Sequence, residues 1–176
     1  MRLSTPTRRA LIAGLSSIVA TAGVATPVTP AAAKKKAKKT TDISCALTLF
    51  ATIRQPAPTA ANFGTATCSR PFGTGVQQDS SVTTRTSLTT GSFSGPFKLF
   101  FDRGTINGTF TISFVTSLSA AYQITGVTYQ GTLKVTGGTA AYRKVRGTGT
   151  VAGSSPDAVT TTLAYKLKLT GVRRGR

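Results

Sequence analysis

Apolar and polar residues alternate along most of the chain after residue 40, with the period of two that is typical of β-strands. The clearest run covers residues 162–169, where apolar residues alternate with two lysines and smaller residues. This run predicts a strand with an apolar inner face and a lysine-bearing outer face. Three such apolar faces are expected: Leu47, Leu49, Ala51 and Ile53; Phe110, Ile112 and Phe114; and Leu163, Tyr165, Leu167 and Leu169.

Between these runs the chain is rich in Thr, Ser, Gly, Val and Phe, which favour strands and tight turns. Further strands are expected at residues 63–68, 82–88, 93–102, 122–135 and 147–151. Residues 55–61, with two prolines, are expected to form a loop. Turns are expected at the hairpin candidate Asn107-Gly108, at Gly73, Gly91 and Gly104, and at Ser154-Ser155-Pro156.

Residues 131–153 give the most specific local prediction. A strand with Leu133 and Val135 on one face runs into Gly137 and Gly138. A short helix-compatible segment follows, and a second strand starts after Gly147. Glycine adopts positive φ at little cost, so the paired glycines predict a tight reversal.

Together these elements predict an all-β domain. Many short strands without crossover helices are typical of an antiparallel barrel or sandwich. We favour the barrel, because closure removes the exposed edges that a strand-rich chain would otherwise present.

The charged residues narrow the possible functions. The chain has 22 Lys and Arg against 4 Asp and Glu, for a formal net charge of +18, and it has no His. Catalytic triads, Cys-His pairs and histidine metal sites are therefore excluded. All four acids are aspartates, so the composition favours a protein that is not an enzyme, with no metal and no cofactor.

The first residues resemble an export signal. Arg2, Arg8 and Arg9 precede an apolar run from residue 10 to residue 25, and small residues allow cleavage after Ala25 or after Ala33. The adjacent arginines also resemble a twin-arginine signal. An uncleaved membrane anchor is the alternative, but the run is shorter than the roughly 20 residues of a membrane span. We therefore expect a secreted or cell-envelope protein.

Four segments are expected along the chain. Residues 1–33 form the signal peptide and a Pro/Ala/Thr-rich segment, residues 34–42 a basic disordered linker, residues 43–171 the barrel, and residues 172–176 a basic tail. The basic residues either form a solvated surface or contact an anionic envelope polymer, a membrane surface or nucleic acid without sequence-specific readout. The candidates for this contact are Lys34, Lys35, Lys36, Lys38, Lys39, Arg143, Lys144 and Arg146.

The two cysteines, Cys45 and Cys68, are expected to form a disulfide bond, which is common in exported proteins. Closing a loop of this length would stabilise the fold by roughly 3 kcal/mol. The alternative is two reduced cysteines that pack as small apolar side chains.

The segment Thr136-Gly137-Gly138-Thr139-Ala140-Ala141-Tyr142, followed by Gly147-Thr148-Gly149, resembles the dirigent and allene oxide cyclase proteins and their exported bacterial relatives. Residues 92–97 and 108–110 lie where that family has a long hairpin, and Ala140 replaces a usual glycine. The resemblance covers residues 43–171. It implies an eight-stranded antiparallel calycin-like barrel with an internal cavity.

The same resemblance implies two activities: steering the coupling of phenoxy radicals, or cyclising an unsaturated epoxide. Cyclisation in the family uses a glutamate, which this chain lacks, and neither Asp79 nor Asp102 matches a family position. These aspartates remain the catalytic candidates of a dirigent- or cyclase-like alternative.

The aromatic residues either fill the barrel or line a cavity for one small apolar ligand. A barrel of this kind would act as a binding protein, as the catalyst named above, or as a structural envelope protein without a ligand. The candidates for the cavity lining are Phe97, Phe100, Phe101, Phe110, Phe114, Tyr122, Tyr129 and Tyr165.

Overall fold

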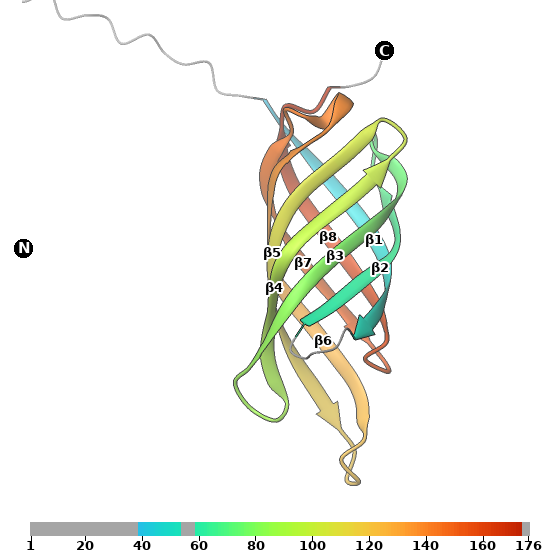
Figure 1. Ribbon diagram of the computed structural model, residues 1–176, viewed down its shortest axis with the longest axis vertical. Coiled ribbons are helices and arrows are strands. Elements are labelled where there is room, and N and C mark those ends of the chain that lie inside the picture. Colours follow the sequence, from blue (N-terminus) through green and yellow to red (C-terminus); the bar gives the residue numbers. More distant parts are fainter. Residues whose placement is uncertain (1–38, 54–58, 174–176) are drawn as a thin grey trace, which may run out of the picture. The chain divides into compact units, whose positions relative to one another are not determined.

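The computed structural model describes residues 39–53 and 59–173, which form a closed eight-stranded antiparallel barrel (Figure 1). Each strand pairs with the next one along the chain, and β8 pairs with β1 to close the sheet. The elements are β1 (Thr40–Ile53), β2 (Thr59–Cys68), β3 (Gly73–Arg85), β4 (Thr90–Phe101), β5 (Gly104–Leu118), β6 (Ile124–Gly138), the 3₁₀ helix η1 (Ala140–Tyr142), β7 (Arg146–Ser155) and β8 (Thr160–Thr170). The predicted all-β antiparallel barrel is confirmed.

Alternation identified the inner faces of three strands correctly. Leu163, Tyr165, Leu167 and Leu169 of β8 are all buried, and the lysines between them are exposed. The same holds for Leu47 and Leu49 of β1 and for all three predicted residues of β5. The signal-peptide prediction and residues 34–38 lie outside the described residues. Within the described part of the chain, no helix is long and apolar enough to cross a membrane.

The hairpin expected at Asn107-Gly108 is wrong, because both residues lie inside β5. A register shift between β5 and β6 occurs at this point. A Cβ atom on Gly108 would come within 2.5 Å of the Phe97 ring, so the glycine makes room for a core side chain. The reversal occurs earlier, at Gly104, whose φ of +132° favours glycine.

The strand expected at residues 82–88 is also misplaced. The observed strand, β3, ends at Arg85, and Leu88 lies in the following loop with 70% of its surface exposed. The polarity of β3 is inverted, with polar residues such as Gln77 inside and Val82 outside. The alternation of apolar residues cannot predict such a strand, because its inner face is polar.

Other boundaries differ by a few residues. Tyr122 lies in the β5–β6 loop and not in a strand, and Asp102 lies in the β4–β5 turn. Gly91 is within β4, and the expected loop at residues 55–61 overlaps β2, which begins at Thr59.

The reversal after Gly137 and Gly138 has a different origin from the one expected. Both glycines remain in β6, and η1 turns the chain toward β7, with Ala140 at a φ of +46°. Gly138 is required for another reason, since a Cβ atom there would collide with the Thr105 carbonyl oxygen.

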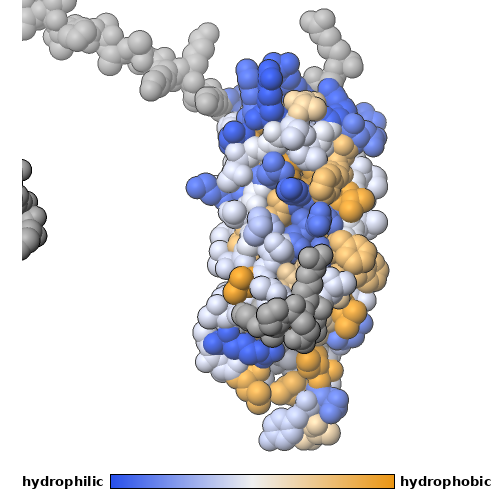
Figure 2. Space-filling view, in the orientation of Figure 1, coloured by the Kyte–Doolittle hydropathy of each residue, from blue (hydrophilic) through white to orange (hydrophobic). Residues whose placement is uncertain are grey.

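Aromatic side chains close the end of the barrel where η1 lies. Phe72 from the β2–β3 turn packs on Tyr142 and Phe101, with ring centroids 5.0 and 5.4 Å apart, and all three are buried. Hydrophilic residues gather outside this closed end (Figure 2). The basic residues placed there by the strand ends and turns are Lys39, Arg70, Arg103, Arg143, Lys144, Arg146 and Arg173.

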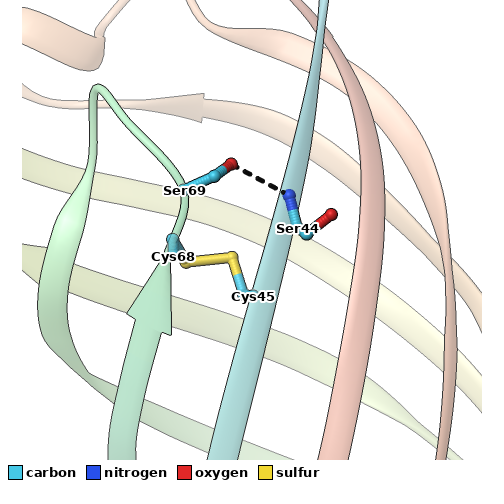
Figure 3. Close-up of a disulfide and its surroundings, with 4 residues drawn as sticks. All are labelled: Ser44, Cys45, Cys68 and Ser69. Carbon is cyan, nitrogen blue, oxygen red and sulfur yellow. Dashed lines mark hydrogen bonds between the residues drawn. A yellow bond between two sulfur atoms is a disulfide. The ribbon is translucent and has the colours of Figure 1, made fainter.

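The predicted disulfide bond is confirmed and joins β1 to β2 near the closed end (Figure 3). Cys45 and Cys68 are directly opposite each other in the ladder, with their Cα atoms 3.9 Å apart. Beside the bond, the backbone N–H of Ser44 donates to Ser69 Oγ at 3.1 Å.

Candidate functional site

A cavity of about 550 Å³ occupies the barrel interior toward the end opposite η1. It extends from Asp79 and Tyr165 in the middle of the barrel to Ile124 and Ala158 beside the β5–β6 and β7–β8 loops. This volume lies within the range of small-molecule sites in proteins. The barrel is therefore filled by side chains at one end and hollow toward the other.

One wall of the cavity is apolar and largely aromatic. Phe93 of β4 stacks on Phe114 of β5 with ring centroids 4.7 Å apart, and the Tyr129 ring of β6 lies 6.3 Å from Phe93. Phe110 and Ile112 continue this wall along β5. Alternation directs these side chains inward, because they occupy every second position of their strands.

The surface beside this wall is polar and comes mainly from β3, the strand that pairs with β4. Asp79, Ser81, Thr83 and Arg85 occupy consecutive inward positions and all line the cavity. Small hydroxyl side chains leave space that larger apolar residues would fill. The inverted polarity of β3 is therefore what makes a hollow interior with hydrogen-bonding groups.

A hydrogen-bonded network forms the floor of the cavity. Asn62 Nδ2 of β2 donates to Asp79 Oδ1 at 2.7 Å, and Gln77 Nε2 donates to Asp79 Oδ2 at 2.8 Å. Gln77 Nε2 also donates to the Tyr165 hydroxyl at 2.9 Å. Gln77 Oε1 is buried and has no hydrogen-bond partner among the described residues.

Burial dominates the electrostatics of this floor. Asp79 is only 5% exposed, and desolvation raises the pKa of its carboxyl group, although the Asn62 and Gln77 amides partly oppose the rise. Burial also raises the pKa of the Tyr165 and Tyr129 hydroxyls, so both stay neutral at pH 7. Within residues 39–53 and 59–173, the hydrogen bonds to Asp79 come from neutral amides.

Arg85 is held at the outer end of the polar wall. Its Nη1 donates to the Leu88 carbonyl oxygen at 3.1 Å, and its guanidinium carbon lies 5.8 Å from the centroid of the Phe114 ring. Around the same end of the barrel, loop and strand-end residues expose large apolar side chains: Leu88, Tyr122, Ile124 and Val159.

The structure divides the eight aromatic candidates into three groups. Phe110, Phe114, Tyr129 and Tyr165 line the cavity. Phe97 and Phe101 are buried in the core but are not among the lining residues. Phe100 and Tyr122 are exposed, because Phe100 points outward between two inward residues and Tyr122 lies in a loop.

The two aspartate candidates are separated. Asp79 is on the cavity floor, whereas Asp102 is exposed in the β4–β5 turn at the closed end.

The sequence did not predict four residues of the site and its surroundings: Asn62, Gln77, Arg85 and Phe93. The polar series at positions 77, 79, 81, 83 and 85 has the period of a strand, but it was not read as an inner face because none of its members is apolar.

The described candidates for an anionic contact are exposed and lie at the closed end. Arg143 and Lys144 follow η1, and Arg146 Nη1 donates to the carbonyl oxygens of Arg143 and Val145 at 3.1 and 2.7 Å. These bonds hold the guanidinium against the turn. Lys39 precedes β1 and is also exposed, whereas Lys34, Lys35, Lys36 and Lys38 lie outside the described residues.

No cluster of potential metal ligands occurs among the described residues. No protein-family model matches the chain, and no curated protein matches it significantly.

Proposed function

We propose that this chain is an exported binding protein that holds one small, mostly apolar molecule inside the barrel. The observation that carries the proposal is the cavity of about 550 Å³, which is lined by an aromatic wall and by the polar residues of the neighbouring strand β3. Apolar walls with a few placed polar groups are characteristic of ligand sites. The disulfide between Cys45 and Cys68 is consistent with a protein that works after export.

Native mass spectrometry of the protein exported by its own cells tests this proposal. We expect a co-purified small molecule to add a discrete mass to the folded chain. Thr83→Trp would fill the cavity, whereas Thr84→Trp, on the outer face of the same strand, provides a matched control. The added mass should disappear in the first variant and persist in the second. A folded protein without bound mass that also takes up no small apolar molecule would contradict the proposal.

A second candidate function is catalysis at the cavity floor. It is supported by the position of Asp79, a carboxyl group with a raised pKa that lines the same cavity as the Tyr165 hydroxyl. Such a group can transfer protons to a bound substrate. Incubating the co-purified molecule with wild type and with Asp79→Asn, and following its mass, tests this function. Conversion by wild type alone supports catalysis, and recovery of the unchanged molecule from both supports binding only.

We further propose that the basic closed end contacts anionic polymers of the cell envelope. Seven described lysines and arginines lie at that end, and the unplaced residues 34–38 add more lysines. Retention on an anionic polymer should fall as salt rises, because screening weakens exposed charges. Arg143→Glu/Lys144→Glu should elute at lower salt, whereas Lys98→Glu, away from the turns of that end, should change little. Retention that does not depend on salt would contradict this contact.

A further inference from the structure

The floor of the cavity holds a carboxylate without a cationic partner among the described residues. Asp79 is 5% exposed, and both of its oxygens accept hydrogen bonds from neutral side-chain amides. A buried charge is costly unless an opposite charge or several hydrogen bonds compensate for it. From this geometry we infer that the bound molecule is an organic amine whose ammonium group pairs with Asp79. The inference rests on the proposed binding function and specifies its ligand class.

The hydrogen-bonding capacity of the floor favours a donor. Each Asp79 oxygen accepts one hydrogen bond from a side-chain amide and can accept at least one more. Asp79 itself lines the cavity, so these remaining acceptor positions are open to a bound molecule. A protonated amine brings up to three N–H donors, whereas a carboxylate ligand would bring only acceptors to a site that already has them in excess.

The aromatic wall suits the rest of such a molecule. The rings of Phe93, Phe114 and Tyr129 provide an apolar surface for a hydrocarbon or aromatic body. Their faces also attract a nearby cation through the ring quadrupole. An amphipathic amine would therefore place its charged end at the floor and its apolar part along β4, β5 and β6.

Arg85, the other charged side chain that lines the cavity, does not cancel the effect of Asp79. It is six residues farther along β3, or roughly 20 Å at the usual rise of a strand. Coulomb energy falls with distance. The repulsion between Arg85 and an ammonium group about 4 Å from Asp79 is therefore roughly five times weaker than the attraction between that group and Asp79. Arg85 is also engaged with the Leu88 carbonyl oxygen and the Phe114 ring.

The net charge of the protein makes this inference easy to test. A chain with a formal charge of +18 attracts anions and repels cations over most of its surface. A preference for an amine over an isosteric acid therefore requires a local cause. Of the aspartates, Asp79 lines the cavity, whereas Asp42, Asp102 and Asp157 are not among its lining residues.

The experiment compares 1-naphthylmethylamine, 1-naphthalenemethanol and 1-naphthoate by their fluorescence at pH 7, using protein stripped of co-purified material by organic extraction. The chain has no tryptophan to interfere. We expect the amine to bind at least tenfold more tightly than either other probe. Asp79→Asn should reduce its affinity to that of the alcohol and leave the alcohol unaffected. Asp102→Asn, at the closed end, should leave all three affinities unchanged.

The affinity of the amine should also fall when the pH drops below the raised pKa of Asp79, because protonation removes the charge. The other groups facing this carboxyl are Asn62 on β2, Gln77 on β3 and Tyr165 on β8, none of which changes charge between pH 4 and 8. Tyr129 on β6 also stays neutral over this range, and Arg85 on β3 is the other charged side chain that lines the cavity. The alcohol should bind independently of pH.

The outcomes separate this inference from the proposed function. If the alcohol or the acid binds as tightly as the amine, or if Asp79→Asn does not weaken the amine, the amine inference is wrong while binding in the barrel stands. If none of the three probes binds to protein that thermal unfolding shows to be folded, the inference fails together with the proposed site. Thr83→Trp adds a tryptophan, so its affinities are measured by calorimetry; if amine selectivity survives in this variant, the site lies elsewhere and both proposals fail.

Discussion

At the scale of single residues, Asp79 is the least expected side chain in this barrel. It occupies an inward position that an ordinary core would give to an apolar residue, and its carboxyl group receives hydrogen bonds from Asn62 and Gln77. These bonds only partly offset the desolvation that raises its pKa. A residue of this kind lowers the stability of the empty protein at neutral pH.

Asp79→Asn should therefore raise the melting temperature of the empty protein at pH 7. The pKa of Asp79 is higher in the folded state, so its protonated form favours folding at low pH, and this contribution is lost as the pH rises through the folded pKa. Asparagine cannot ionise, and rotation of the Gln77 amide lets Oε1 accept from the new Nδ2. Melting curves from pH 3 to pH 8 should converge at low pH. A lower melting temperature for the variant at pH 7 would contradict this account.

Ala140 provides a second prediction at this scale. Its φ of +46° lies in the left-handed region, which costs an L-residue about 1–2 kcal/mol. Ala140→Gly should therefore stabilise the fold by up to about 1 kcal/mol in chemical denaturation, after the greater flexibility of the unfolded glycine chain is included. Ala141→Gly, in the same 3₁₀ turn but without a positive φ, is the control and should destabilise by about 0.5–1 kcal/mol. Equal effects of both substitutions would refute the argument.

At the scale of elements, some strands mainly fill the core and others mainly line the cavity. β8 and the first half of β1 supply apolar side chains to the filled part of the barrel. β3 supplies polar groups to the hollow part, and β4, β5 and β6 supply aromatic rings. The inward position Gly131 in β6 faces the backbone of β5 closely, since a Cβ atom there would collide with the Thr111 carbonyl oxygen and lie 2.7 Å from the Ile112 Cα.

Gly131→Ala should consequently destabilise the protein by about 1–3 kcal/mol, the range for overpacked interiors, because β5 and β6 must move apart. Gly126→Ala in the same strand is a matched control: its Cβ would make only an ordinary contact, 3.8 Å from the Ser155 carbonyl oxygen. Urea unfolding of both variants measures the difference. Similar stabilities would mean that the close approach of β5 and β6 at Gly131 has no energetic consequence.

At the scale of the described barrel, the two ends differ in structure and polarity. The cluster of Phe72, Phe101 and Tyr142 and the disulfide lie toward the basic end, and the other end combines the cavity with exposed apolar residues such as Leu88 and Tyr122. Under the proposed function, the basic end would contact an anionic surface while the cavity at the other end takes up an apolar ligand.

Replacing both cysteines by alanine should lower the free energy of unfolding by about 3 kcal/mol, because the unfolded chain loses the constraint on the loop between them. The bond joins residues 23 positions apart that already face each other in the ladder, so the barrel itself should persist. Denaturation in urea with and without reductant gives the value, and wild type under reducing conditions should match the double variant. An unchanged midpoint after verified reduction would contradict the prediction.

The sequence predicted strands well where apolar side chains face a filled interior. Leu163, Leu167 and Leu169 alternate with lysines because one side of β8 meets the core and the other meets water. The same rule missed β3, since its inner face is polar and carries Gln77, Asp79 and Ser81. The hairpin prediction at Asn107-Gly108 is wrong because this residue pair, which is common in hairpin turns, lies here at a register shift inside β5, beside the Phe97 ring.

By itself, the sequence determined that the domain is all-β and favoured both a closed antiparallel barrel and a bond between its two cysteines, because strand periodicity and cysteine chemistry are local or compositional properties. Only the tertiary structure decided which inward side chains fill the barrel and which leave it hollow. Closure brings Asn62, Asp79 and Tyr165 from three strands to one floor, and it moves Asp102 to the opposite end. Which side chains meet depends on the strand register and on the curvature of the whole sheet, and no short segment encodes either property.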